Sequence, residues 1–220
     1  MIEIKEHSLS QFDEELRALF GQLDTLNSHM QAFSALIHKS LADGANRTDE
    51  ARAIDKLVNH LEFAIDQQVM RLISKFAPMV DELRLVLAAL KIASSCERAS
   101  DKLKNTAKRV GRLSGILDAE RKEHCAALLL RASAQMDKVM AQFSLLDDAA
   151  MEQIIAEREE IHQLYKRSVI GRGELTGELG IQYSLILRNI ERVSELAYDI
   201  AKIGYAARHN RKFEKTENSQ

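Results

Sequence analysis

A row of oxygen-bearing side chains runs through the segment CERASDKLKNTAK, residues 96–108. Glu97, Asp101 and Asn105 follow one another at four-residue spacing. Because four residues advance a helix by about 400°, the three side chains share one face and drift by only about 40° per step. Carboxylate and amide oxygens arranged in this way can hold a divalent or trivalent cation.

The same pattern returns near the end of the chain in the segment IERVSELAYDIAK, residues 190–202. Glu191, Glu195 and Asp199 take the places of the three residues above, at a constant offset and without a gap. We call the two rows the first and second acidic stripes. Their recurrence indicates an internal repeat in which each half of the chain ends in a helix with an acidic face.

A second interpretation of the stripes needs no metal. Acidic residues four apart are common on solvated helix faces, where basic side chains neutralise them. Lys104, Lys108 and Lys202 lie within or next to the stripes and could act as these partners. The residues alone therefore leave both metal ligation and ion pairing open.

The composition is typical of a soluble all-α protein. Of the 220 residues, 45% are hydrophobic and 29% are charged, and a single proline and nine glycines favour long helices with few turns. The net charge of -2 gives no reason to expect a nucleic acid as a partner.

Cysteine usage and hydropathy point to the cytoplasm. Cys96 and Cys125 have no metal-type spacing, so we expect free thiols in a reducing compartment. We find no apolar stretch near the roughly 18 residues that cross a bilayer, and the first residues do not resemble a signal peptide.

Apolar residues at three- and four-residue spacing predict six long helices, three in each half. We expect a short lead over residues 1–7, a first three-helix bundle over 8–115, a second over 118–210, and a frayed polar tail over 211–220. The fold class is all-α, with two tandem three-helix bundles related by the repeat. We expect the first helix to be capped by Ser8 or Ser10, the second by Thr48 or Asp49, and the fourth by Asp118. Pro78 is expected in the first turn of the third helix, and a capping box from Ser144 to Asp147 is expected at the start of the fifth. The sixth helix should begin at about Leu179, after a loop marked by Gly171, Gly173 and Gly177.

The two stripes, together with the segment FAPMVDELR at residues 76–84, resemble the PhoU family of bacterial phosphate-uptake regulators. That family is similar in having two three-helix repeats, each with a Glu/Asp-x-x-x-Asp motif. Asp55 and Asn59 match family positions on the second helix. Ser100 and Ser194 stand where the family usually has glycine, and Glu195 stands for an aspartate.

The resemblance implies a metal held by the motifs, with iron or zinc as expected occupants, while oxygen donors also suit manganese, magnesium or calcium. The expected ligands are Glu97, Asp101, Glu191 and Glu195, followed by Asn105, Asp199 and Asp55.

The resemblance also implies a non-enzymatic, cytoplasmic regulator of phosphate transport and phosphate-starvation signalling. It would act as a helical adaptor between the ATPase subunit of a phosphate ABC transporter and a sensor histidine kinase, reaching the membrane only through these partners, and it leaves a homodimer open.

Other functions remain open from the residues. One is a metal-cluster or metal-storage bundle with redox or hydrolytic activity, and another is a helical scaffold without metal. Glu159 and His162 match half of a di-iron carboxylate motif, but no second copy accompanies them. Four arginines could bind phosphate by charge, although no glycine-rich loop accompanies them: Arg98, Arg109, Arg112 and Arg192.

Overall fold

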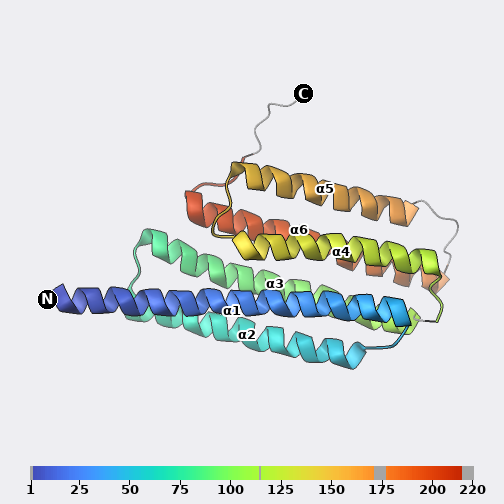
Figure 1. The fold of residues 1–220 in the computed structure, drawn as a ribbon, viewed down its shortest axis with the longest axis horizontal. Helices are drawn as coiled ribbons and strands as arrows, with labels where there is room; N and C mark the ends of the chain where they lie inside the picture. The colour runs from blue at the N-terminus through green and yellow to red at the C-terminus, as the bar shows by residue number, and fades with distance from the viewer. Residues whose placement is uncertain (1, 114, 171–176, 215–220) are drawn as a thin grey trace.

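Six α-helices make up almost all of the described chain. The structure, a computed structural model, describes residues 2–113, 115–170 and 177–214, and no strand occurs within these ranges. The helices are α1 (Ile2–Asp43), α2 (Thr48–Phe76), α3 (Val80–Leu113), α4 (Ala119–Gln142), α5 (Asp148–Ile170) and α6 (Gly177–His209). The all-α prediction is confirmed (Figure 1).

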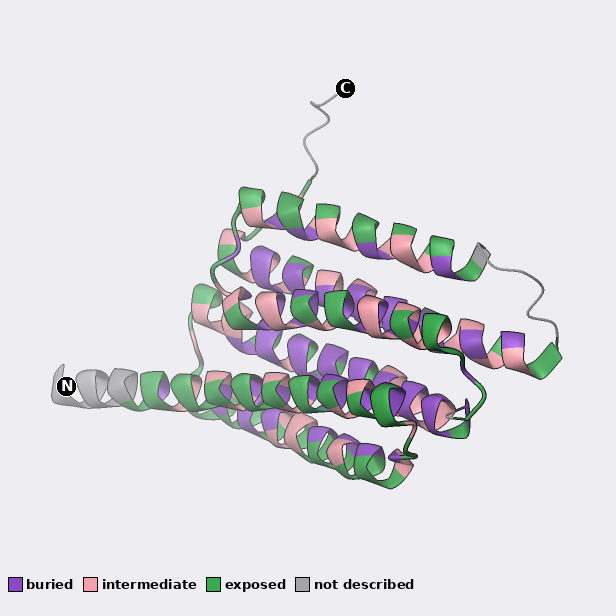
Figure 2. Ribbon diagram, turned by 45° about the vertical axis from the view of Figure 1, so that its right-hand side comes forward, coloured by how far each residue is buried: buried purple, intermediate pink, exposed green. Residues whose placement is uncertain are grey.

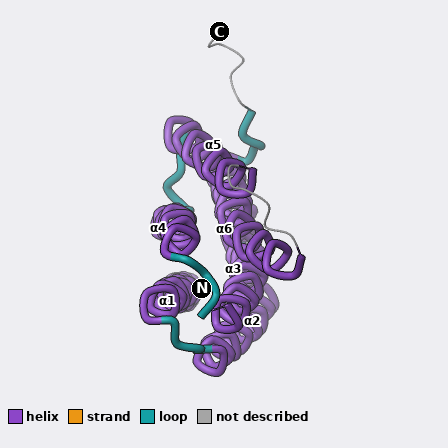
Figure 3. The backbone as a smooth tube through the Cα atoms, turned by 90° about the vertical axis from the view of Figure 1, so that its right-hand side faces the viewer, coloured by secondary structure: helices purple, strands orange, loops and turns teal. Residues whose placement is uncertain are grey.

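The helices form two three-helix bundles that pack side by side. α1, α2 and α3 contact one another, as do α4, α5 and α6. The bundles meet where α3 packs along α6 and α1 packs along α4. The view along the helices in Figure 3 shows α2 and α5 at the two outer edges of this arrangement. The short links between consecutive helices place them antiparallel, as the sequence predicts.

Small residues allow α3 and α6 to approach closely at the centre of the molecule. Ala93, Ala99 and Ala107 on α3 are buried, as are Ala197 and Ala201 on α6. Figure 2 shows the buried faces of both helices turned inward. Buried residues from both bundles belong to one continuous hydrophobic core, so the two repeats share a single interior.

The predicted apolar row of the first helix is confirmed. Leu19, Leu23, Leu26, Phe33 and Ile37 are all fully buried on the inner face of α1. The start of the helix differs from the prediction, since α1 begins at Ile2 and no separate lead precedes Ser8. The segment IEIKEH contains neither proline nor glycine, so nothing in it stops the helix from extending toward the N-terminus.

The predicted cap of α2 is wrong. Neither Thr48 nor Asp49 takes the N-cap position, which belongs to Arg47, and the Arg47 side chain makes no capping bond. Asn46 compensates, because its Oδ1 accepts the Thr48 N–H at 3.1 Å. The prediction that Pro78 lies in the first turn of the third helix is also wrong, since α3 begins two residues later, at Val80. Ala77, with φ of 45°, ends α2 just before this proline.

Asp118 caps α4 as predicted, because its Oδ1 accepts the Arg121 N–H at 2.8 Å. The predicted role of Ser144 at the start of α5 is wrong. Asp147 caps this helix instead, accepting the Ala150 N–H at 2.8 Å. Each of these two helices is thus capped by the aspartate that precedes it, and a carboxylate at this position also interacts favourably with the positive end of the helix dipole.

Two residues of the predicted polar tail, Arg211 and Phe213, contact α5 and α6. Arg211 forms an ion pair with Asp148 at 3.1 Å, and the ring of Phe213 packs edge-on against Tyr205 at 5.4 Å. Residues 215–220 of the expected tail lie outside the described residues, as do Gly171 and Gly173 of the expected loop. Gly177, with φ of 76°, begins α6.

Cys96 on α3 and Cys125 on α4 are free and buried, which confirms the prediction of free thiols. Burial raises the pKa of each thiol to about 12. Of the described helices, none combines the length and apolar character that crossing a membrane requires.

Candidate functional site

Four charged residues from two helices form what we call the first acidic cluster: Asp55, Glu97, Asp101 and Lys104. Asp55 lies on α2 and is only 7% exposed, while the other three lie on α3. The Lys104 ammonium is 2.7 Å from Asp55 Oδ2 and 2.6 Å from Asp101 Oδ1. Lys104 therefore joins α2 to the first stripe.

The Lys104 ammonium supplies the positive charge that these carboxylates need. Burial acts to lower the pKa of Lys104, but hydrogen bonds from Lys104 to Asp101 and Asp55 outweigh it, so the pKa is raised and the ammonium stays charged. Ser100 donates a further hydrogen bond to Asp55 Oδ1 at 3.0 Å. Both oxygens of the buried Asp55 carboxylate thus have a partner.

Glu97 remains the uncompensated member of the first acidic cluster. Burial raises the pKa of its carboxyl group, and repulsion from Asp101, Glu62 and Asp55 raises it further, while Lys104 lowers it in part. No ion pair reaches Glu97 among the described residues. Its negative charge is therefore held at a free-energy cost in the folded protein.

The second stripe forms a separate set of contacts, which we call the second acidic cluster: His162, Arg188, Glu191, Arg192 and Glu195. Glu191 is 2% exposed. His162 Nδ1 lies 2.6 Å from Glu191 Oε1, and Arg188 donates to Glu191 Oε2. Arg188 also lies 3.8 Å from Glu195, which pairs with Arg192. Two arginines and a histidine thus hold the two glutamates.

The outer members of the stripes stand apart from both clusters. Asp199 forms an ion pair with Lys202 at 2.7 Å. Asn105 is partly exposed on α3, and its backbone carbonyl oxygen accepts a hydrogen bond from the Arg109 side chain at 3.2 Å. Neither residue contacts the carboxylates of its own stripe in the interactions seen here.

The seven predicted metal ligands do not converge on one point in this structure. Within residues 2–113, 115–170 and 177–214, no group of three histidine, cysteine, aspartate or glutamate side chains is placed to hold one. The Lys104 ammonium lies between Asp55 and Asp101, and Arg188 lies against Glu191 and Glu195. Metal ligation by these residues stays a prediction.

Three residues of the second acidic cluster are not among the predicted metal ligands: His162, Arg188 and Arg192. In the sequence, His162 is named only in half of a di-iron motif and Arg192 only as a residue that could bind phosphate, and Arg188 is not named. His162 is on a different helix from Glu191, whereas Arg188 is on the same helix, three residues before Glu191. The i, i+3 spacing of Arg188 and Glu191 is a signal that could have identified this pair.

Comparison with known proteins finds similarity between this chain and PhoU proteins. Residues 24–110 match the family model of the PhoU domain. A phosphate-specific transport system accessory protein PhoU homolog from Zymomonas mobilis is 28% identical over 212 residues, covering 91% of this chain and 88% of its own length. A homolog of the same description from Rhizobium meliloti is 29% identical, covering 90% and 87%.

Residues 24–110 of this chain are therefore assigned to the PhoU domain, and the similarity to PhoU homologs extends over about nine-tenths of the chain. The fold agrees with that assignment, since the crystal structure of the phosphate transport system regulatory protein PhoU from Streptococcus pneumoniae superposes with a TM-score of 0.78. That structure is 23% identical, and the match covers 92% of this chain and 99% of that one. The recognition of the PhoU family from the acidic stripes is confirmed.

The serines that replace the usual PhoU glycines have defined roles in this structure. Ser100 donates to Asp55 of α2, whereas Ser194 donates to Gln135 of α4 at 2.5 Å. Gln135 in turn donates to the Ile154 carbonyl oxygen of α5 at 3.0 Å. Both serines are buried, so each links its stripe helix to a neighbouring helix. The repeats thus share the serine but not its partner.

Substitution of Glu97 by glutamine is expected to stabilise the folded protein at neutral pH by about 0.5 kcal/mol, the scale of one like-charge contact. A carboxyl group with a raised folded-state pKa lowers the free energy of unfolding as pH rises through that pKa. The gain should therefore shrink as pH falls toward 4. Urea unfolding at several pH values measures it.

The matched control for Glu97→Gln is Glu152→Gln at an exposed position of α5, for which we expect no change. If the first acidic stripe ligates a metal, Glu97→Gln should instead lower the free energy of unfolding, because glutamine removes a ligand from the folded state. Metal content by mass spectrometry, on protein purified without chelator or affinity metal, completes the test.

Proposed function

We propose that this protein is a non-enzymatic regulator of phosphate transport and phosphate-starvation signalling. The observation that carries the proposal is the match over about nine-tenths of the chain to relatives described as phosphate-specific transport system accessory proteins. A third relative, a phosphate-specific transport system accessory protein PhoU from Escherichia coli, is 32% identical over 105 residues and matches 46% of this chain.

The chemistry of the acidic clusters supports a binding role rather than a catalytic one. Lys104 in the first cluster and Arg188 in the second are engaged with the carboxylates that would otherwise ligate a cofactor or accept a proton. The Lys104–Asp55 ion pair joins α3 to α2, and the contact of His162 with Glu191 joins α5 to α6. A rigid array of long helices offers grooves and flat faces to other proteins.

The proposed partners are the ATPase subunit of a phosphate ABC transporter and a sensor histidine kinase, both met at the cytoplasmic side of the membrane. By contacting both, the protein would restrain phosphate uptake and repress phosphate-starvation genes when phosphate is plentiful. A redox or metal-storage function has no observation in its favour in this structure. A homodimer stays a prediction.

Deletion of the gene tests the proposal. In phosphate-rich medium, the deletion strain is expected to express a phosphate-starvation reporter that the parent strain represses, and a plasmid copy of the gene should restore repression. A deletion strain that represses the reporter normally would contradict the proposed function.

A further inference from the structure

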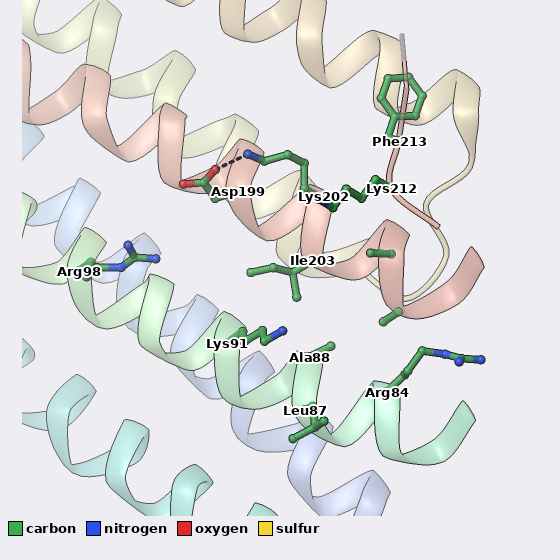
Figure 4. Close-up of a pocket in the computed structure, with 12 residues that line it drawn as sticks. Arg84, Leu87, Ala88, Lys91, Arg98, Asp199, Lys202, Ile203, Lys212 and Phe213 are labelled. Atoms are coloured by element: carbon green, nitrogen blue, oxygen red, sulfur yellow. Dashed lines mark ion pairs between the residues drawn. The ribbon is translucent and has the colours of Figure 1, made fainter. Parts of the chain in front are cut away.

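An open groove of about 670 Å³ runs between the N-terminal half of α3 and the C-terminal half of α6. Figure 4 shows Ile203 of α6 pointing into the space above Lys91 and Ala88 of α3. The two helices run antiparallel here (Figure 1), so the groove follows both. Its lining is apolar at the centre, where it is formed by Leu87, Ala88, Ile203, Ala206, Ala207 and Phe213.

Basic side chains border this apolar centre. Five basic residues line the groove against one acidic residue, Asp199, and they are Arg84, Lys91, Arg98, Lys202 and Lys212. The groove is thus strongly positive, although the whole chain has a net charge of -2. This separation of charge favours an acidic partner at this face.

Three of these cations lack a carboxylate partner among the described residues. Lys202 is paired with Asp199 and Arg84 with Asp81, but Lys91, Arg98 and Lys212 form no ion pair there. Within the described part of the chain, Arg98 donates to Ser95 Oγ at 3.0 Å. Lys91 and Lys212 are exposed. These three charges are therefore available to an incoming ligand.

The length of the groove fits a helix. Arg84 and Arg98 bound it along α3, and at 1.5 Å per residue the separation is about 21 Å, or about four helical turns. An amphipathic helix laid into such a groove buries its apolar face against the floor and places its flanking side chains beside the basic borders. Acidic flanks would complement those borders.

We propose that the groove between α3 and α6, at the end lined by Arg84, Lys91 and Phe213, docks an acidic amphipathic helix of a partner protein. This inference rests on the proposed adaptor function, because it gives that function a surface and a partner chemistry. Leu87, which is 38% exposed, lies in the floor and provides apolar area for the docked helix.

The test reverses charge on the border with the double variant Lys91→Glu/Lys212→Glu. The matched control is Lys56→Glu/Lys166→Glu, which makes the same charge change at exposed positions of α2 and α5. The probes are the transporter ATPase subunit and the cytoplasmic part of the sensor kinase encoded in the same genome, with affinity measured by biolayer interferometry.

The expected result is a loss of about tenfold or more in affinity for one of these two proteins in the groove variant, with little change in the control variant. The wild-type affinity should also fall as salt is raised. A photo-cross-linking residue placed at Leu87 is expected to label a helical segment of that partner with aspartate or glutamate on its flanks.

Other outcomes overturn the inference in distinguishable ways. If the wild type and the groove variant bind the partner proteins with equal affinity, the groove is not part of the interface, although the proposed adaptor function is not contradicted. Failure of the wild type to bind either probe contradicts the adaptor function itself. With partner binding unchanged, a groove variant that loses self-association in light scattering assigns the groove to a second copy. A variant that loses binding to phosphatidylglycerol vesicles instead assigns it to lipid.

Discussion

Replacement of Lys104 by methionine is expected to lower the free energy of unfolding by about 2–3 kcal/mol. The substitution keeps most of the aliphatic stem but removes the ammonium that lies between Asp55 and Asp101. The Asp55 carboxylate would then be buried with only the Ser100 hydroxyl as a partner. The loss is smaller than for a fully buried pair, because the Lys104 side chain is 29% exposed.

Urea unfolding followed by circular dichroism measures this loss, and Lys102→Met two residues away on α3 serves as the control. Lys102 forms no ion pair among the described residues, so its substitution should cost less than about 0.5 kcal/mol. Equal stability of the two variants would show that Lys104 contributes nothing beyond a surface contact. Recovery of Lys104→Met by added manganese, with no effect on wild type, would show that lysine and metal compete for the same carboxylates.

The second large effect is expected for Gly204→Ala in α6. A Cβ atom at this position would lie 2.2 Å from the Phe143 carbonyl oxygen and 2.8 Å from its carbon. These are backbone atoms at the end of α4, so relief requires α6 and α4 to move apart. Overpacking of this kind is expected to cost about 2–3 kcal/mol, which thermal and urea unfolding can measure.

The control for this variant is Gly21→Ala in α1, where no atom lies within 4 Å of the added Cβ. Alanine is the better helix former, so this substitution should raise stability by up to about 1 kcal/mol. Opposite signs for the two alanines would therefore separate helix propensity from helix packing. A stable Gly204→Ala protein would mean that the close approach of α6 to Phe143 is not required for folding.

The helices could be predicted from the sequence because their signals are local. The apolar row of α1 and the Asp118 cap depend on residues within one or two turns of each other, and both are confirmed. The start of α2 was harder to predict, since Asn46, Thr48 and Asp49 are all good capping residues. Only the path of the backbone decides that Arg47 takes the cap position.

The acidic clusters show where prediction from sequence ends. The spacing of Glu97 and Asp101 predicts that they share a helix face, and the sequence also predicts Lys104 as a possible partner for their negative charges. The spacing does not show that Lys104 reaches Asp55 on another helix, because that contact depends on how α2 and α3 pack. The contact of His162 with Glu191 is of the same kind, since it joins α5 to α6.

The two buried thiols allow cooperative opening of the core to be measured by thiol labelling. Cys96 and Cys125 belong to different repeats but lie in one shared core. A thiol reagent reaches either sulfur only when that core is exposed to water, and the reactive thiolate is scarce at neutral pH because each pKa is about 12. Equal labelling rates at the two sulfurs would mean that both repeats open as one unit, and unequal rates that one half opens alone.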